Sequence, residues 1–319
     1  MTSQQPTRES RTVVRVRASA KINLFLSVGD LRPDGYHDLV TVFHAVDLAD
    51  ELTIESATRH SVRTTPADGV PAGSRNLAGV AARILAKRTG AGGPVAIEIA
   101  KQIPVAGGMA GGSADAAATL VGCAALWGLD MARGDLAQIG AEIGADVPFA
   151  LTGGTAVGTG RGDLLSPVLA RTPLHWVLAL ADGGLSTPEV FAELDGLRDQ
   201  RKSGPAEPQR VGVVTDMLAA LASGDPAAVA AALGNDLQPA AFSLQPGLRR
   251  TLRAGLSAGA LAGVVSGSGP TIALLCADAE AAGGVAAELA GSGTCRTVRV
   301  ASGPAPGARV VGAGSGVRH

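Results

Sequence analysis

The N-terminal part of the chain alternates apolar and polar residues in the way that half-buried strands require. Residues 12–17 alternate and lead into a second apolar stretch at 24–28, and residues 39–54 continue with a similar pattern. Successive side chains of a strand point to opposite faces, so this period of two predicts strands. Residues 95–99 alternate in the same way, whereas residues 76–88 carry the longer period of a helix.

A glycine-rich segment, residues 102–112, follows the last of these strands. Beyond it the pattern predicts a helix from Ser113 to about Trp127, with Ser113 as its N-cap and Asp115 in its first turn. A further helix is predicted at residues 133–143. The glycine-rich segment is therefore expected to join the end of a strand to the start of a helix.

Beyond residue 171 the chain mixes strand and helix patterns. The polar stretch 196–208 contains two prolines and is expected to be a loop. The remaining predicted elements are strands at 174–181, 262–266, 271–276 and 296–300, and helices at 209–222, 226–233 and 278–290. Because strict β–α–β alternation is missing, the predicted fold class is α+β rather than a doubly wound sheet.

The length of 319 residues favours two domains of ordinary size. The change of pattern after residue 170 divides the chain into a first domain at 12–170 and a second at 171–301. The remaining segment, 302–319, contains five Gly and two Pro. We expect this segment to be a mobile tail.

Composition and charge narrow the classes of function. Hydrophobic residues make up 46% of the chain and charged residues 17%, so a packed core is expected. The formal net charge of −1 leaves no basic excess of the kind that binding to nucleic acid or to a membrane surface requires. The first eleven residues are polar and no run approaches about 18 apolar residues, so we expect neither a secretory signal nor a membrane span.

The cysteines indicate a compartment but no chemistry. Three of them, Cys123, Cys276 and Cys295, stand at wide spacing. Their odd number and spacing match neither a disulfide framework nor a metal site, so we expect a reducing cytoplasm. The sequence does not indicate an oligomeric state.

The glycine-rich segment is the strongest candidate for chemistry. Glycines let the backbone approach phosphate oxygens, and the N–H groups and dipole at the start of a helix favour negative charge. A flexible Gly/Ala connector is the alternative, in a chain with 44 Gly. The residues predicted to hold a nucleotide are Pro104, Val105, Ala106, Gly107, Gly108, Met109, Ala110, Gly111, Gly112, Ser113 and Ala114.

Two common phosphate motifs are excluded. A Walker A loop requires a Lys at the end of the glycine segment, and no Lys lies between Lys101 and Lys202. A dinucleotide fingerprint requires the spacing G-x-G-x-x-G in an early β–α–β unit, which Gly107 to Gly112 does not match.

The segment resembles the phosphate motif of the GHMP kinases, which has the form Pro-x-x-x-Gly-hydrophobic-x-Gly-Gly-Ser-small. Residues 20–26, 32–37 and 144–149 are similar to the branch of that family that phosphorylates 4-diphosphocytidyl-2-C-methyl-D-erythritol. Residues 266–269 are similar to the family's third glycine motif. The glycine-rich segment and residues 20–26, 32–37 and 144–149 are four motifs in the right order, which together are more specific than any one of them.

The resemblance implies a two-domain GHMP kinase fold. Residues 12–170 would form the ATP-binding and catalytic domain, similar to ribosomal protein S5 domain 2. Residues 171–301 would form a ferredoxin-like C-terminal domain.

The resemblance also implies a catalytic pair, Lys21 and Asp146. Asp146 would accept the proton of the acceptor hydroxyl as general base. Lys21 would hold Asp146 ionised and stabilise charge on the acceptor oxygen or on the transferring phosphoryl group. From the residues alone, a solvated strand-end Lys and a turn Asp bonded to its own backbone remain open.

The acceptor implied by the resemblance is a small cytidine diphosphate polyol. Tyr36, the single tyrosine, and Phe191 would stack on the two faces of the cytosine, and His37 would read its edge. Asn23 and Thr187 would bind the hydroxyl groups of the erythritol. Simple packing remains the alternative for both aromatic residues.

The cofactor implied is ATP with Mg²⁺ carried by its phosphates, without a dedicated protein ligand for the metal. Lys101 is a candidate contact to the adenine or ribose. Two other readings stay open: another GHMP kinase of the homoserine or mevalonate type, and a non-catalytic nucleotide-binding protein on the same scaffold.

Overall fold

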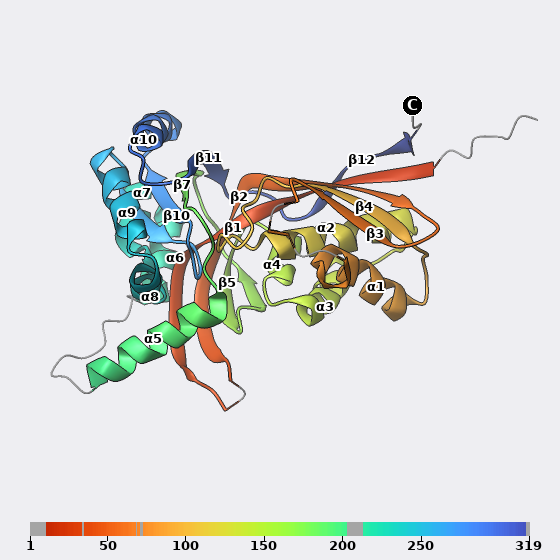
Figure 1. Cartoon of the computed structure of the whole chain (residues 1–319), viewed down its shortest axis with the longest axis horizontal. Coiled ribbons are helices and arrows are strands. Elements are labelled where there is room, and N and C mark those ends of the chain that lie inside the picture. Colours follow the sequence, from red (N-terminus) through yellow and green to blue (C-terminus); the bar gives the residue numbers. More distant parts are fainter. Residues whose placement is uncertain (1–10, 34, 68, 71–72, 203–212, 317–319) are drawn as a thin grey trace, which may run out of the picture.

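The chain is built on two β-sheets, one of eight strands and one of four (Figure 1). The computed structural model describes residues 11–33, 35–67, 69–70, 73–202 and 213–316. The eight-stranded sheet contains β1 (Arg11–Leu31), β2 (His37–Ser56), β3 (Ser61–Thr65), β4 (Val95–Ala100), β5 (Thr155–Gly160), β6 (Leu164–Pro167), β8 (Gly234–Asn235) and β12 (Arg309–Gly316). The four-stranded sheet contains β7 (Leu174–Leu180), β9 (Ala262–Val265), β10 (Ile272–Cys276) and β11 (Thr297–Gly303).

Helices follow each sheet along the chain. A short 3₁₀ turn (Gly73–Arg75) precedes the first of them. The helices beside the larger sheet are α1 (Leu77–Thr89), α2 (Gly111–Leu126), α3 (Arg133–Ile143) and α4 (Val147–Thr152). The later helices are α5 (Thr187–Lys202), α6 (Val214–Ser223), α7 (Pro226–Ala232), α8 (Gln238–Leu244), α9 (Gly247–Ser257) and α10 (Ala279–Gly291). This content confirms the predicted α+β class.

The long hairpin of β1 and β2 is the frame of the larger sheet. The two strands pair antiparallel from Val13 opposite Glu55 to Leu31 opposite His37, with register shifts in between. The two apolar stretches predicted at 12–17 and 24–28 are thus one continuous strand. Because β1 and β2 extend past the helices, their far end forms one wall for segments from the second half of the chain (Figure 1).

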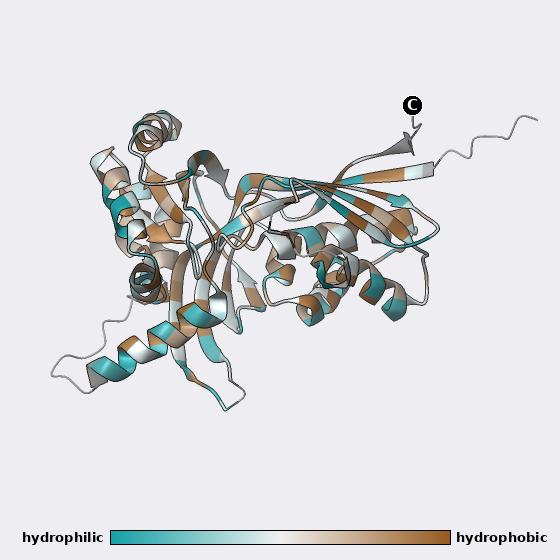
Figure 2. Ribbon diagram, viewed as in Figure 1, coloured by the Kyte–Doolittle hydropathy of each residue, from teal (hydrophilic) through white to brown (hydrophobic). Residues whose placement is uncertain are grey.

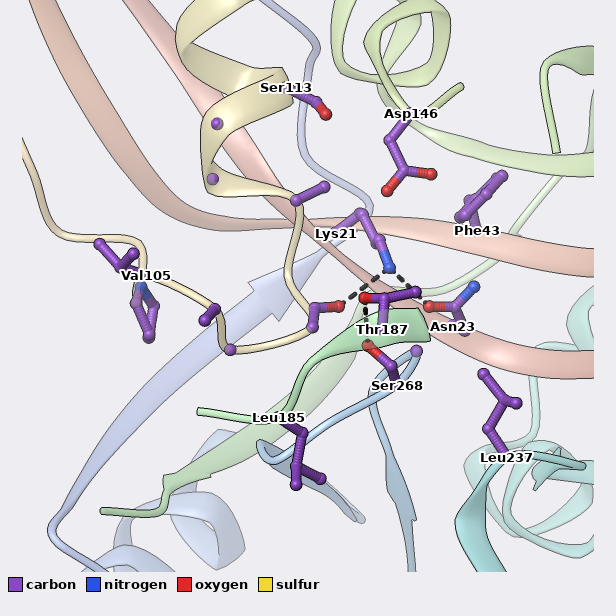
Figure 3. Close-up of a pocket in the computed structure, with 18 of the residues that line it drawn as sticks. Lys21, Asn23, Phe43, Val105, Ser113, Asp146, Leu185, Thr187, Leu237 and Ser268 are labelled. Atoms are coloured by element: carbon purple, nitrogen blue, oxygen red, sulfur yellow. Dashed lines mark hydrogen bonds between the residues drawn. The ribbon is translucent and has the colours of Figure 1, made fainter. Parts of the chain in front are cut away.

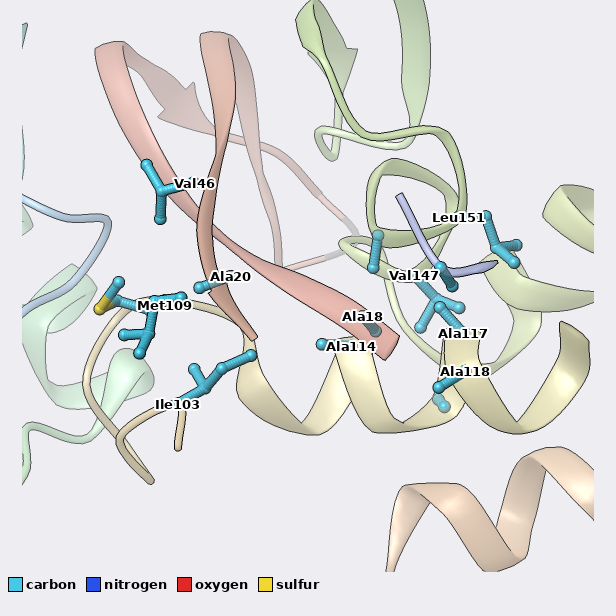
Figure 4. Close-up of a cluster of buried hydrophobic side chains, with 14 of the residues drawn as sticks. Ala18, Ala20, Val46, Ile103, Met109, Ala114, Ala117, Ala118, Val147 and Leu151 are labelled. Atoms are coloured by element: carbon cyan, nitrogen blue, oxygen red, sulfur yellow. The ribbon is translucent and has the colours of Figure 1, made fainter. Parts of the chain in front are cut away.

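Small residues bring α2 close to this hairpin. Figure 4 shows Ala114, Ala117 and Ala118 of the helix packed beside Ala18 of β1. At Gly122 of the same helix, a Cβ atom would come within 2.5 Å of Ile54 and 2.8 Å of Val16. Close packing of this kind makes each added methyl group costly, so α2 has little freedom to move.

The amphipathic helix α5 lies across the free end of the hairpin (Figure 1). Figure 2 shows hydrophilic residues along most of its length. Its buried residues Val190 and Leu194 pack against Leu26 and Val28 of β1. One prediction is wrong here: residues 196–202, expected to be a loop, continue α5. The rest of that predicted loop, residues 203–208, lies outside the described residues.

The C-terminal segment contradicts the prediction of a mobile tail. After β11 ends at Gly303, residues 309–316 form β12, which pairs antiparallel with β1. The Arg133 guanidinium of α3 donates hydrogen bonds to the carbonyl oxygens of Leu151 and Ala308, which fasten this return. The Gly and Pro residues of this segment therefore lie in the connection to β12 and in β12 itself, and not in a tail. Residues 317–319 lie outside the described residues.

We expect removal of residues 309–319 to make the protein self-associate. The deletion would expose the edge of β1 from Arg11 to Arg17, and a long unpaired edge is a template for pairing between molecules. Light scattering during size-exclusion chromatography measures the effect. A variant that lacks only residues 317–319 is the control, and a deletion variant that stays as dispersed as this control would contradict the expectation.

Candidate active site

A cavity of about 390 Å³ lies where the glycine-rich segment, the β1–β2 hairpin and the turn after β9 meet (Figure 3). Its lining includes most of the residues singled out from the sequence. They are Lys21, Asn23, Lys101, Pro104, Val105, Ala106, Gly107, Gly108, Ala110, Gly111, Gly112, Ser113, Asp146, Thr187 and Phe191. Segments far apart in the chain thus converge on one site.

Lys21 is a buried residue of β1 whose ammonium group is held in place from several sides. It donates hydrogen bonds to Asn23 Oδ1 at 2.8 Å and to the carbonyl oxygen of Gly108 at 2.9 Å. It also lies over the Phe43 ring, 5.7 Å from the ring centre. An ammonium carries three N–H donors, so one of them remains after these two hydrogen bonds.

The orientation of Asn23 follows from a chain of hydrogen bonds. The Thr41 hydroxyl donates to the carbonyl oxygen of Phe25, at 2.8 Å, so it accepts from Asn23 Nδ2, also at 2.8 Å. The amide oxygen of Asn23 must therefore face Lys21. The structure uses both ends of this amide inside the protein, and the predicted contact of Asn23 with the acceptor hydroxyls stays a prediction.

Asp146 precedes α4 and lines the same cavity. Figure 3 shows its side chain on the side of the cavity that faces Lys21. Burial lowers the pKa of Lys21, and the attraction of Asp146 opposes that shift. Lys21 and Asp146, which are far apart in the sequence, are thus electrostatic neighbours.

The glycine segment packs against the turn that follows β9. Gly108 has φ +74°, and a Cβ atom there would come within 2.0 Å of the carbonyl oxygen of Ser266. The Ser266 hydroxyl donates to the Gly108 carbonyl oxygen at 3.0 Å, and Asn235 donates to Val265 and Gly267 at 2.8 and 2.7 Å. Gly108 is therefore required by contact with the protein itself. Ser266 belongs to the predicted third glycine motif, whereas Asn235, which fixes that turn, was not predicted.

The start of α2 differs from the prediction in a way that matters for phosphate binding. The helix begins at Gly111, and its N-cap is Ala110 in the left-handed conformation (φ 58°), not Ser113. No side chain caps the helix. Its first N–H groups, at Gly111, Gly112 and Ser113, lie beside the cavity, so a sixteen-residue helix presents its positive end to it.

This arrangement fits a polyphosphate. Uncapped N–H groups at a helix start form a ready site for an anion. Two of the predicted binding residues do not contribute side chains to it, because Met109 and Ala114 are fully buried in the core. Among the described residues no group of three or more His, Cys, Asp or Glu is arranged to hold a metal ion.

Lys101 supports the loop from behind. Its ammonium contacts Asp50 at 2.5 Å and Asp115 at 2.9 Å, and all three side chains are buried. Asp50 also accepts hydrogen bonds from the backbone N–H groups of Gln102 and Ile103. The ammonium predicted to contact the adenine or ribose is thus engaged by two carboxylates, and the predicted contact itself stays a prediction.

One ammonium between two carboxylates leaves an excess of negative charge. Burial raises the pKa of the Asp115 carboxyl to about 7; the attraction of Lys101 opposes the rise and the repulsion of Asp50 adds to it. Asp115 Oδ1 is buried with no hydrogen-bond partner in the described chain. Both observations indicate that Asp115 holds a proton more readily than an ordinary aspartate.

Of the residues predicted for the acceptor, Asn23, Thr187 and Phe191 line the cavity, whereas Tyr36 and His37 are not among its lining residues. The Thr187 hydroxyl lies 2.9 Å from the Ser268 hydroxyl, and Phe191 lines the cavity. The Phe191 ring lies 5.1 Å from the His37 ring, centre to centre. Tyr36 is 54% exposed and lies under the Arg161 guanidinium, 5.0 Å from its ring centre.

The Phe191 ring thus contacts His37 and the Tyr36 ring contacts Arg161, and the predicted stacking of Tyr36 and Phe191 on the cytosine stays a prediction. Asp34, in the motif before Tyr36, lies outside the described residues. Arg161 lines the cavity but was not predicted, because a single Arg in a Gly-rich turn carries no local signal.

The family models and the relatives that match this chain all belong to the GHMP kinases. The model of the GHMP kinases N terminal domain matches residues 76–154, and that of GHMP kinases C terminal matches residues 217–295. The 4-diphosphocytidyl-2-C-methyl-D-erythritol kinase of Rhodococcus jostii is 60% identical over 300 residues, covering 93% of this chain and 95% of the relative. The protein of that name in Mycobacterium tuberculosis is 56% identical over 302 residues, covering 94% and 93%.

Solved structures share the fold. A crystal structure of 4-(cytidine 5'-diphospho)-2C-methyl-D-erythritol kinase is 30% identical, with a TM-score of 0.72, and covers 90% of this chain and 98% of its own. Homoserine kinase from Cytophaga hutchinsonii has a TM-score of 0.73 at 19% identity, covering 98% and 100%. At that identity the second likeness concerns the fold alone.

We expect Asp115→Asn to flatten the pH dependence of the free energy of unfolding between about pH 4 and pH 7. The folded protein keeps the Asp115 proton up to about pH 7, whereas an ordinary aspartate has a pKa of 3.8. The folded state then binds more protons over this range, so Asp115 makes stability fall as pH rises, and the fall ends above about pH 7.

Urea unfolding of the wild type and the variant across this range measures the effect. The stability of the wild type relative to Asp115→Asn should decrease as pH rises. Asp135→Asn, an exposed acid of α3, is the control. A stability difference between wild type and Asp115→Asn that is the same at every pH would contradict the raised pKa.

Proposed function

This chain belongs to the 4-diphosphocytidyl-2-C-methyl-D-erythritol kinase family of the GHMP kinases, and we propose which of its residues perform the reaction. The chain phosphorylates the 2-hydroxyl of 4-diphosphocytidyl-2-C-methyl-D-erythritol with ATP, giving the 2-phosphate and ADP, in the non-mevalonate route to isopentenyl diphosphate. The observation that carries the proposal is the single cavity that Lys21, Asp146 and the start of α2 share.

The start of α2 binds the phosphates of ATP. The N–H groups of Gly111, Gly112 and Ser113 lie at the cavity and would donate hydrogen bonds to the phosphate oxygens. The helix dipole adds to this attraction. Mg²⁺ held by the phosphates, with no dedicated protein ligand, would neutralise part of their charge. The cluster of Lys101, Asp50 and Asp115 keeps the loop in place, because Asp50 accepts hydrogen bonds from the backbone N–H groups of Gln102 and Ile103.

Asp146 accepts the proton of the 2-hydroxyl while the hydroxyl oxygen attacks the γ-phosphorus and ADP leaves. Lys21 stabilises the negative charge that spreads over the attacking oxygen and the phosphoryl group. Its position supports this role, because Asn23 and Gly108 hold the ammonium without neutralising it. A charge fixed in this way need not reorganise when the reaction occurs.

Arg161 binds the diphosphate of the acceptor. The cations that line the cavity are Lys21, Lys101 and Arg161. Lys101 is engaged by two carboxylates and Lys21 faces Asp146, whereas Arg161 contacts the Tyr36 ring on the acceptor side. A planar guanidinium matches phosphate oxygens through paired hydrogen bonds.

Three free thiols, Cys123, Cys276 and Cys295, support a reducing compartment, and we propose the cytoplasm. No helix in the described ranges is long and apolar enough to cross a membrane.

Release of ADP with three acceptors in parallel tests the function. We expect turnover with the cytidine diphosphate polyol and not with homoserine or mevalonate; turnover with one of the latter, or with none, would favour one of the two alternatives.

We expect Asp146→Asn and Lys21→Ala each to lower kcat at least ~100-fold with the fold intact, which is the usual contribution of a general base or of a fixed charge. Steady-state ADP release measures kcat, and urea unfolding verifies the fold. Asp130→Asn, an exposed acid before α3, is the control. Near wild-type turnover of folded Asp146→Asn would remove the residue from the mechanism.

We expect Arg161→Ala to raise KM for the acceptor about tenfold and to leave KM for ATP unchanged, because a hydrogen bond to a charged group contributes ~1.5–3 kcal/mol. Initial rates at varied acceptor concentration measure this change. Arg59→Ala, an exposed Arg between β2 and β3, is the matched control. If Arg161→Ala changes both KM values equally, the residue does not act on the acceptor diphosphate.

A further inference from the structure

The acceptor half of the cavity is a groove between one strand and one helix. On β2, Leu39, Thr41 and Phe43 line the cavity. Side chains two apart along a strand share a face, so His37 is the next residue of this row. His37 thus lies next along β2, just beyond the residues that line the cavity.

The opposite wall has the same regularity. Thr187 and Phe191 of α5 line the cavity, four residues apart. Asp195 is four residues further on the same face of the helix. Beyond the lining residues, β2 and α5 are joined by His37 and Asp195, with His37 Nε2 3.0 Å from Asp195 Oδ1.

This junction of β2 and α5 is rigid. The His37 side chain is 5% exposed, and its ring packs on Phe191 at an interplanar angle of 31°. One turn beyond Asp195, the Arg198 guanidinium donates to the Val28 carbonyl oxygen at 2.8 Å and to Asp236 at 3.1 Å. The helix that carries Asp195 is thereby fastened to the hairpin that carries His37.

The contact determines where the imidazole carries its proton. A carboxylate only accepts hydrogen bonds, so Nε2 must donate to Asp195 and must bear the hydrogen. In the neutral ring the other nitrogen, Nδ1, is then an acceptor. Within the described ranges no protein group hydrogen-bonds to Nδ1.

We propose that Asp195 is a positioning residue that makes His37 Nδ1 an acceptor for the 4-amino group of cytosine, and that this contact excludes uracil. The inference rests on the proposed function, in which a cytidine diphosphate occupies this groove. Stacking on Phe191 accepts any base, so discrimination requires hydrogen bonds. Cytosine presents an amino donor where uracil presents a carbonyl oxygen. With uracil, that oxygen and His37 Nδ1 would both be acceptors, so no hydrogen bond could form between them.

Asp195→Asn tests the proposal, because an amide can turn either its oxygen or its N–H₂ toward Nε2 and so allows both tautomers. Calorimetric titration with CDP and with UDP measures base preference without turnover. We expect the wild type to bind CDP more tightly than UDP. In the variant the ratio of the two dissociation constants should fall at least about tenfold, because the site no longer fixes an acceptor that only cytosine can satisfy. Glu189→Gln, an exposed acid on the same helix, is the matched control and should keep the preference.

Kinetics give the second readout. With the cytidine acceptor, Asp195→Asn should raise KM and leave kcat unchanged, because the substitution disturbs base recognition and not the reacting groups. A wild type that binds CDP and UDP equally would overturn the proposal. It would also be overturned by an Asp195→Asn variant that weakens the binding of both nucleotides by the same factor.

Failure of the proposed function looks different. A wild type that prefers CDP in the titration, loses the preference with Asp195→Asn, and releases no ADP with the cytidine acceptor would support the role of Asp195. It would at the same time contradict the assigned reaction.

Discussion

The carbonyl oxygen of Gly108 accepts hydrogen bonds from the Lys21 ammonium and from the Ser266 hydroxyl, and this junction joins three distant parts of the chain. A buried polar group that loses its partner costs about 1–3 kcal/mol, so the three groups hold their places together. Only a residue without a side chain fits, because the Ser266 carbonyl oxygen lies 2.0 Å from where a Cβ of Gly108 would be. The position of Lys21 at the phosphate loop thus depends on contacts within the protein.

Local patterns were enough to predict much of this arrangement. The alternation in 39–54, the helical period in 76–88 and the glycine-rich link before α2 correspond to β2, α1 and the loop. The pairing of Lys21 with Asp146 was implied by the resemblance to the GHMP kinases and not by local pattern, and the structure brings both residues to one cavity. Patterns of this kind succeed where a residue's role depends on neighbours a few positions away.

The errors arise where the decisive partner is distant in the sequence. Ser113 has the composition of an N-cap, but packing of the loop against the turn after β9 starts the helix two residues earlier, at Gly111. Lys101 carries no local sign that Asp50 will reach it from β2. The pairing of His37 with Asp195 likewise depends on α5 crossing the end of the hairpin, which no period in either segment announces.

The pairing of β12 with β1 has a consequence for how the molecule is made. The strand β1, at residues 11–31, finds its outer partner in residues 309–316, which are synthesised much later. Domains generally fold from the N-terminus during synthesis, at about 5–20 residues per second. The outer edge of β1 therefore stays open during synthesis until residues 309–316 have been made.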